Sequence, residues 1–324
     1  MNPKNNPKVS VCVATRNHTD FIEQCVRSAL DQKTTFDFEV IVGDDASTDS
    51  TPEILRNLQI EYPDNLTVIV HKSHINGSQN YFSVHNRAMG QYVAHIDGDD
   101  YWLPGKLQRM VDVMDENHDV NIAWHRVFVE VEDGARVVAM PIGNHHKLFG
   151  GYKLDFNTLI KYYGTTGQHS ASIYRRSARK MFSSDVEMLD YFHTLSLCED
   201  GYALYVPDVL SIYRAYRSYT TITNTPGAPA VANALIYLLD HYRERFPKYR
   251  KEICAQAVFN GALRGWLGFK QWIEFYKLAA RTKTLPRLRD LFFIFRIFMA
   301  QRGSVRARLL KKYRNDLKKI VGAL

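Results

Sequence analysis

An apolar run ends in a group of acidic residues near position 97 of this 324-residue chain. The run 92–96 has the pattern of a buried strand and is followed at once by Asp97-Gly98-Asp99-Asp100. Burying unpaired carboxylates is costly, so such a group either stays solvated or binds a cation. Magnesium and manganese prefer oxygen ligands and keep coordination positions for substrate phosphates. The group therefore predicts a solvated acidic turn or a divalent cation site.

Strand and helix patterns alternate along the residues that precede the acidic group. Alternation of this kind predicts an α/β fold, with a mostly parallel central sheet and helices on both of its faces. The predicted strands are 9–14, 38–42, 66–70 and 92–96, and the predicted helices begin at Asp20, Pro52 and Gln79.

Polar residues follow three of these strands at the point where each strand ends. Thr15-Arg16-Asn17 follows the first strand, Asp44-Asp45 follows the second, and the acidic group follows the fourth. Open α/β sheets bind their ligands at the carboxyl ends of the strands. We therefore expect the three polar groups to converge on one ligand site.

The three motifs together resemble the family-two glycosyltransferases of the GT-A fold, which has a Rossmann-like sheet with flanking helices. The matching segments are Val-Ser-Val-x-Val-Ala-Thr-Arg-Asn at 9–17, Glu-Val-Ile-Val-x-Asp-Asp-x-Ser-x-Asp-x-Thr at 39–51, and Asp-Gly-Asp-Asp at 97–100. The resemblance covers roughly residues 7 to 215. It implies an inverting transfer of a sugar from a nucleotide diphosphate donor, usually a uridine one, with Mn²⁺ or Mg²⁺. The implied acceptor is a hydroxyl of a glycan or a lipid-linked glycan.

Roles for individual residues follow from the resemblance by position. Asp45 is expected to bond the base of the nucleotide, and Asp99 is expected to bind the metal on the diphosphate, together with Asp97. The implied donor-binding residues are Thr15, Arg16, Asn17, Asp45, Asp97 and Gly98.

The acceptor hydroxyl needs a base, and a carboxylate within hydrogen-bond reach contributes about a hundred- to ten-thousand-fold in rate. The family usually has an acid that opens an aromatic-containing helix, about twenty residues before a Tyr-Arg pair. Asp190, upstream of Tyr213-Arg214, matches this pattern. Its neighbours differ from the glycine and tryptophan that usually flank the acid, so Glu199 and Asp200 remain alternative bases. Capping a helix is the structural alternative for all three.

Three further residues are candidates for contacts with the acceptor or the diphosphate, and each has a structural alternative. His169 is either such a contact or a hydrogen-bonded structural histidine. Trp102 either stacks on an acceptor sugar or packs beneath the site, and Arg214 either faces the diphosphate or fixes a loop. His145-His146 lacks a third ligand at suitable spacing, which favours a loop pair over a metal site.

Composition is that of a soluble globular protein, with 45% hydrophobic and 23% charged residues. The four cysteines form no Cys-x-x-Cys pair, which favours buried reduced thiols in a cytoplasmic protein. The N-terminus lacks the apolar core of a signal peptide. No uncharged apolar stretch reaches the roughly 18 residues of a membrane span. These observations predict a cytoplasmic protein.

The basic excess lies in residues 281–324, which hold 13 Lys and Arg against two Asp, while the residues before them carry a net charge of −3. Basic amphipathic helices with bulky apolar residues are predicted at about 284–322. Such helices suit an anionic membrane, where each basic group contributes about 1 kcal/mol. Packing on the catalytic domain is the alternative. We expect a peripheral protein at the inner face of the cell membrane, which would bring the site to a lipid-carried acceptor.

The chain is predicted to contain a catalytic domain at 1–224 and a helical C-terminal region at 225–324. The alternative function is a catalytically silent nucleotide-binding module whose basic tail binds nucleic acid. The tail's phenylalanines have helical spacing, and no recognised nucleic-acid motif is present, which makes nucleic acid an unfavoured partner. A dinucleotide-dependent oxidoreductase is excluded because no Gly-x-Gly-x-x-Gly follows the first strand.

Overall fold

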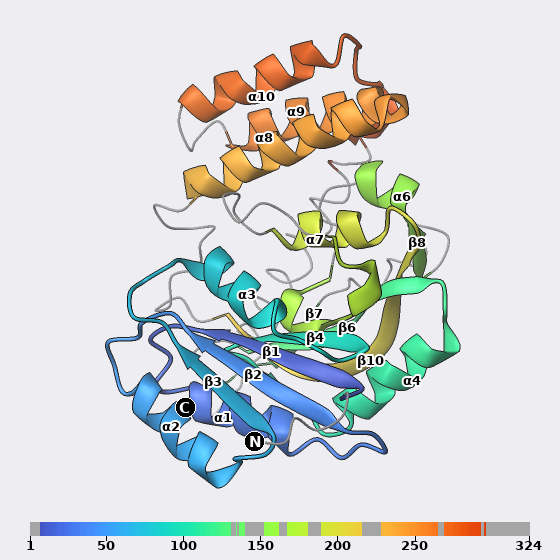
Figure 1. The fold of residues 1–324 in the computed structure, drawn as a ribbon. Helices are drawn as coiled ribbons and strands as arrows, with labels where there is room; N and C mark the ends of the chain where they lie inside the picture. The colour runs from blue at the N-terminus through green and yellow to red at the C-terminus, as the bar shows by residue number, and fades with distance from the viewer. Residues whose placement is uncertain are drawn as a thin grey trace, which may run out of the picture.

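The protein folds around one mixed ten-stranded sheet, shown in Figure 1. The computed structural model describes residues 7–130, 134, 136–139, 152–161, 167–180, 189–215, 228–264, 269–292 and 295. The strand order is β3-β2-β1-β4-β9-β6-β10-β5, with β7 beside β6 and β8 beside β10. The predicted α/β fold class with a helical C-terminal region is confirmed.

The first four strands pair in parallel, as the alternating pattern predicts. Apolar residues at spacings of three and four give α1 one buried face, which packs on the sheet. Helices α1 and α2 lie on one side of these strands and α3 lies on the other (Figure 1). The elements are β1 (Val9–Thr15), α1 (Ile22–Leu30), β2 (Phe38–Asp44), α2 (Thr51–Glu61), β3 (Leu66–Val70), α3 (Gly77–His85) and β4 (Tyr92–Asp97).

The second half of the sheet mixes strand directions. Strand β9 runs antiparallel to both of its neighbours, β4 and β6, whereas β6 and β10 are parallel. The sheet is therefore parallel in its first half and mixed in its second. The elements are β5 (Tyr101–Trp102), α4 (Lys106–Glu116), β6 (Val120–Glu130), β7 (Arg136–Ala139), β8 (Lys153–Asp155), α6 (Phe156–Lys161), η1 (His169–Ala171), β9 (Ser172–Arg175), α7 (Asp190–Leu197) and β10 (Tyr202–Arg214).

Three C-terminal helices, α8 (Ala228–Arg245), α9 (Arg250–Arg264) and α10 (Phe269–Arg281), form a layer beyond α6 and α7 (Figure 1). Their buried side chains belong to the same apolar cluster as those of α6 and α7, including Leu238 and Phe192. Gln256 of α9 donates a hydrogen bond to the Tyr191 hydroxyl at 3.0 Å. The layer is thus packed on the α/β part through a continuous core.

Several sequence-based expectations concern residues outside the described ranges. The predicted domain boundary at 224/225, the pair His145-His146 and most of the amphipathic segment 284–322 lie there, so these stay predictions. The four cysteines are buried free thiols, as expected. Within the described ranges, no helix has the length and apolar character needed to cross a membrane.

The shared core gives a prediction for Leu238, which is fully buried on α8. Leu238→Ala should lower the free energy of unfolding by about 2–5 kcal/mol, because it leaves a cavity between two layers. Leu288→Ala is the matched control, since that side chain is 85% exposed, and it should change stability by at most about 0.5 kcal/mol. Denaturant unfolding followed by circular dichroism measures both. A separate transition for the C-terminal helices would contradict a continuous core.

Candidate functional site

The three polar groups predicted to converge do lie side by side. Strand β1 is hydrogen-bonded to β2 on one side and to β4 on the other. In this register Thr15 is opposite Asp44 and Ala14 is opposite Asp97, so the three strands end at the same level. The loops that follow them form one edge of the sheet.

Asp45 is a buried acid in the loop after β2, at the inner end of a polar chain that reaches the surface. Its carboxylate contacts His74 Nδ1 at 2.8 Å and accepts a hydrogen bond from the Ile75 N–H at 2.7 Å. His74 Nε2 in turn lies 3.0 Å from the Arg16 guanidinium. Because arginine only donates, this contact assigns the proton of His74 to Nδ1. Arg16 is thus linked to Asp45 through one imidazole.

Thr15 and Asn17 have different surroundings. Thr15 is buried, and its hydroxyl lies 3.1 Å from His18 Nδ1. Asn17 is exposed in the left-handed region, with φ 54°, and its side-chain oxygen accepts a hydrogen bond from the Thr48 N–H at 2.8 Å. Gly98 covers Thr15 so closely that a Cβ there would lie 2.4 Å from the threonine hydroxyl. Glycine is required at this contact because any side chain would collide.

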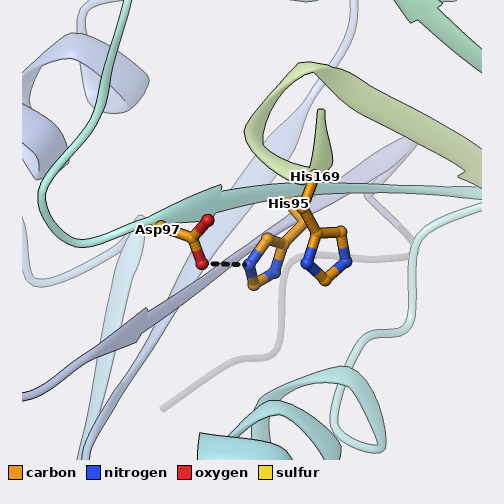
Figure 2. Close-up of side chains that lie close together, drawn as sticks. All are labelled: His95, Asp97 and His169. Atoms are coloured by element: carbon orange, nitrogen blue, oxygen red, sulfur yellow. Dashed lines mark hydrogen bonds and ion pairs between the residues drawn. The ribbon is translucent and has the colours of Figure 1, made fainter. Parts of the chain in front are cut away.

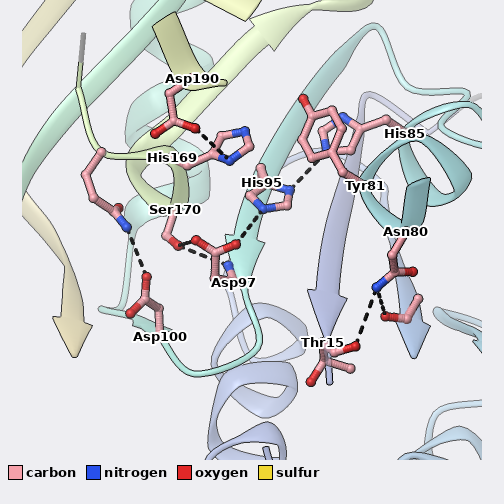
Figure 3. A network of polar contacts seen from close by, with 12 residues as sticks. Thr15, Asn80, Tyr81, His85, His95, Asp97, Asp100, His169, Ser170 and Asp190 are labelled. Carbon is pink, nitrogen blue, oxygen red and sulfur yellow. Dashed lines mark hydrogen bonds and ion pairs between the residues drawn. The ribbon is translucent and has the colours of Figure 1, made fainter. Parts of the chain in front are cut away.

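Asp97 is held by hydrogen bonds from two sides (Figure 3). His95 Nε2 lies 3.1 Å from Oδ1, and Ser170 donates to Oδ2 at 3.1 Å while accepting from the Asp97 N–H at 3.0 Å. Burial opposes ionisation of Asp97, yet the contacts with His95 and Ser170 hold its pKa well below the ordinary value. Asp97 is therefore ionised at neutral pH.

Asp99 is subject to the opposite electrostatic effect. Burial, and after it the charge of Asp97, raise the pKa of Asp99. Two neighbouring carboxylates that disfavour each other's ionisation are relieved by a shared cation, and their oxygens suit Mg²⁺ or Mn²⁺. The donor set at Asp97 and Asp99 thus fits the metal that the family resemblance implies.

A second possible donor set lies beside it. His95, Asp97 and His169 each present one ligand atom within 4.8 Å of the others (Figure 2). The two imidazoles are stacked, with ring centroids 4.0 Å apart and planes 22° apart. Stacked rings present faces to each other rather than lone pairs to a common point. A hydrogen-bonded stack describes this arrangement better than a metal centre.

Asp100 and Arg214 hold the acidic loop at 97–100 in place through buried contacts. Asp100 is fully buried and accepts hydrogen bonds from the Arg214 N–H at 3.0 Å and the Gln168 amide at 3.2 Å. The Arg214 guanidinium lies between the rings of Phe21 and Tyr101 and donates to the Asp99 carbonyl at 2.5 Å. All of these contacts serve to hold the loop, which is the structural alternative for Arg214.

Trp102 packs beneath the site, which is its structural alternative. It is 3% exposed, and its indole N–H donates to the Ser170 carbonyl at 3.1 Å. The ammonium of Lys106 lies 3.3 Å from the centroid of the indole ring and is itself fully buried. Burial lowers the pKa of Lys106 well below its ordinary value. These contacts support the segment that carries Ser170.

Asp190 lies far from the other two candidate bases, Glu199 and Asp200. Asp190 opens α7 with its side chain 46% exposed, and Oδ1 lies 3.2 Å from His169 Nδ1. Burial raises the pKa of Asp190, and His169 opposes that effect. Glu199 and Asp200 lie beyond the other end of the helix, about 13 Å further along at 1.5 Å per residue. Glu199 is buried in ion pairs with Lys180 and Arg245, and Asp200 also pairs with Lys180. Of the three, Asp190 lies beside the acidic loop.

Sequence reasoning missed a cluster of buried imidazoles behind the acidic loop. Tyr174 Oη lies 2.7 Å from His85 Nδ1. His85 Nε2 in turn lies 2.9 Å from His95 Nδ1, so the contacts continue to Asp97 (Figure 3). The position of His95, two residues before Asp97 on one strand, puts both side chains on the same face of the sheet. The spacing of His95 and Asp97 was therefore the feature of the sequence from which their contact could have been predicted. The histidine cluster is defined as His85, His95, His169 and His193.

The chain matches known proteins in sequence and in fold. A family model described as glycosyl transferase family 2 matches residues 10–182, more than half of the chain. An uncharacterised protein of Mycobacterium tuberculosis is 27% identical over 250 residues, covering 73% of this chain and 70% of that protein. The Escherichia coli UDP-Glc:α-D-GlcNAc-diphosphoundecaprenol β-1,3-glucosyltransferase WfaP is 30% identical over 123 residues, covering 38% and 47%. S. aureus TarS 1–349 in complex with UDP-GlcNAc has a similar fold, with a TM-score of 0.65, 17% identity, and 93% and 92% of the chains covered.

The contacts of Ser170 give a prediction with a defined pH dependence. Ser170→Ala removes a hydrogen bond that ionised Asp97 accepts and leaves the Asp97 N–H unpaired. Without divalent cations, the variant should lose about 1–3 kcal/mol of unfolding free energy at pH 7. A lowered carboxyl pKa stabilises the fold above the unfolded value of about 3.9, and this stabilisation is lost as the pH falls through the folded value. The loss of unfolding free energy caused by Ser170→Ala should therefore become smaller in acid.

The control for Ser170→Ala is Ser196→Ala. Ser196 is also buried, but its hydroxyl donates to the His193 carbonyl within α7 and contacts no carboxylate of the described residues. Its deficit should not vary from pH 7 down to about pH 1, the range over which the stabilisation by a depressed aspartate pKa is lost, as measured by urea unfolding. An equal pH response in the two variants would show that Ser170 does not stabilise the charge of Asp97.

Proposed function

The chain belongs to glycosyl transferase family 2 and is a glycosyltransferase, and from this we propose its donor, acceptor and reaction. We infer an inverting transfer of a sugar from UDP to a hydroxyl of a lipid-linked glycan. The observation that carries the proposal is the meeting of Asp45, the pair Asp97 and Asp99, and Asp190 at one edge of the sheet. One similar protein is named for UDP-Glc, and the similar TarS structure is a complex with UDP-GlcNAc, which supports a uridine donor.

The loops after β1 and β2 are the proposed nucleotide site. The Asp45 carboxylate, already held by His74 and the Ile75 N–H, is rigid enough to accept a hydrogen bond from a base. Arg16 and Asn17 are the exposed members of the first loop and border it. A site that discriminates between bases needs polar groups fixed in this way, because unpaired buried groups penalise the wrong ligand.

Asp97 and Asp99 are the proposed ligands of Mn²⁺ or Mg²⁺. A cation bound there would stabilise the charge that develops on the departing diphosphate. Asp97 is held by His95 and Ser170, so its oxygens keep a fixed direction toward the donor. Arg214 and Asp100 keep the loop from moving as charge develops above it.

Asp190 is the proposed base. Its free oxygen takes the proton of the acceptor hydroxyl, and the acceptor oxygen forms a bond to the anomeric carbon as the bond from that carbon to the diphosphate breaks. UDP leaves with the bonding electrons, and attack from the opposite face inverts the configuration. A raised carboxyl pKa makes Asp190 a stronger base than an ordinary aspartate.

Separate variants test the donor site and the base. Asp99→Asn should weaken Mn²⁺-dependent binding of UDP-sugars about tenfold or more, as measured by calorimetry, because one anionic ligand is lost. Asp190→Asn should keep donor binding and lower the rate of UDP release with acceptor by about a hundred- to ten-thousand-fold. Glu199→Gln is the control and should keep transfer. Transfer retained in Asp190→Asn but lost in the control would assign the base to Glu199.

The start of the basic tail is proposed to dock on an anionic membrane. Leu285, Leu288, Phe292 and Phe295 are 84%, 85%, 63% and 48% exposed, an apolar row that the described chain leaves uncovered. The segment 281–324 that contains them has a net charge of +11. Apolar side chains on a basic helix match the chemistry of an anionic lipid surface. Two similar proteins act on acceptors linked to undecaprenol by a diphosphate, which would lie in such a surface.

Vesicle flotation tests the docking surface. Leu288→Glu/Phe292→Glu should abolish flotation of the full chain with vesicles rich in phosphatidylglycerol, and salt should weaken wild-type flotation. Ile60→Glu/Met89→Glu is the matched control, because both side chains are exposed but lie outside the tail. Equal loss in the two variants contradicts a specific surface. Preferential binding of RNA, together with no UDP release from any sugar donor, would instead support the nucleic-acid alternative.

A further inference from the structure

Asp190 is a half-buried carboxylate at the first residue of α7. The contact that orients it is with His169, whose Nδ1 lies 3.2 Å from Oδ1. This contact leaves Oδ2 as the oxygen able to meet an acceptor. The direction of a base matters greatly, because a misplacement of about 1 Å can cost a hundredfold in rate.

His169 is itself fixed from several directions. It begins η1, and the next residue, Ser170, is buried and hydrogen-bonded to Asp97. Its ring stacks on His95 with centroids 4.0 Å apart and on Tyr81 with centroids 5.1 Å apart. The imidazole therefore has a single orientation, set by residues that do not belong to α7.

The surroundings of His169 also assign its tautomer. Nε2 is buried, and it has no hydrogen-bond partner among the described residues. A buried N–H without an acceptor is costlier than an unused lone pair, so the proton belongs on Nδ1, the ring nitrogen that lies 3.2 Å from Oδ1 of Asp190. Burial and the neighbouring His95 lower the pKa of His169, which favours the neutral ring. A neutral donor leaves the negative charge on Asp190.

We propose that His169 is a positioning residue for the transfer: its Nδ1–H holds Oδ1 of Asp190 so that Oδ2 faces the acceptor hydroxyl. The inference rests on the proposed function. In the reaction, Oδ2 gains the acceptor proton, the acceptor oxygen bonds the anomeric carbon, and UDP departs. His169 keeps its own proton throughout. His95 contacts Asp97 on the donor side, and His169 contacts Asp190 on the acceptor side. The stacked rings of His95 and His169 thereby link Asp97 to Asp190.

Two substitutions of His169 separate the hydrogen bond from the ring. His169→Phe keeps an aromatic ring for the stack but loses the donor. His169→Asn keeps an amide N–H close to the position of Nδ1. With UDP-glucose, UDP-galactose or UDP-GlcNAc, Mn²⁺ and GlcNAc-diphosphate-undecaprenol, kcat for UDP release should fall about ten- to a hundredfold in His169→Phe. His169→Asn should recover most of it, and the Kd of the UDP-sugar should stay unchanged in both.

His193→Phe is the matched control. His193 belongs to the same histidine cluster and lies 6.4 Å from His169 between ring centroids, and its Nε2 contacts Tyr81 rather than Asp190. Its kcat should stay within about threefold of the wild type, provided that thermal unfolding shows a folded protein. Equal losses of kcat in His169→Phe and His193→Phe would overturn the inference, as would a loss of donor binding in place of kcat.

A double substitution gives a readout that a general structural role would not move. If His169 acts through Asp190, adding His169→Phe to Asp190→Asn should change the residual rate by less than about twofold. Additive losses would overturn the inference. Failure of the proposed function is distinguishable from this, because the wild type would then release no UDP from any of the three donors.

Discussion

The parallel pairing of β1 with both β2 and β4 is the constraint on which the site depends. Hydrogen bonds fix the register, so Thr15 is opposite Asp44 and Ala14 is opposite Asp97. A shift of one residue in either pair would turn the polar side chains to the other face of the sheet. Short loops that are unrelated in sequence thus place Asp45 and the pair Asp97 and Asp99 at the same edge of the sheet.

The carboxylates at this edge need neighbours that keep them charged and in place. Asp97 has His95 and Ser170, whereas Asp100 beneath it has Arg214 and Gln168. Burial and the charge of Asp97 raise the pKa of Asp99, so its ionised form is the one that a bound cation would stabilise most. Apart from His95 on β4, the supporting residues Gln168, Ser170 and Arg214 come from η1, the residue before it and β10, so they belong to the second, mixed half of the sheet.

Sequence alone predicted the parts that depend on local pattern. The first four strands and the strand-end motifs follow from short-range periodicity, and the helix opened by Asp190 was implied by the family resemblance. It did not predict the partners of those motifs. His85 lies on α3, His193 on α7, and Ser170 is 73 residues from Asp97, so only the tertiary fold brings them together. For Arg214 and Trp102, both roles were compatible with the sequence, and their packing against Phe21, Tyr101 and Lys106 could not be predicted from it.

The hydrogen bonds of Tyr191 have a consequence for how the chain can be divided. Its hydroxyl donates to the Leu159 carbonyl and accepts from Gln256, so the residue next to Asp190 is anchored to α6 and to α9. Helix α7, which carries Asp190, is therefore held in place partly by the C-terminal helices. A fragment ending before α8 would retain every motif recognisable in the sequence. It would still lack Gln256, whose hydrogen bond to Tyr191 helps to fix the position of Asp190. Shortening this protein to its recognisable motifs would thus remove contacts that hold Asp190 in place.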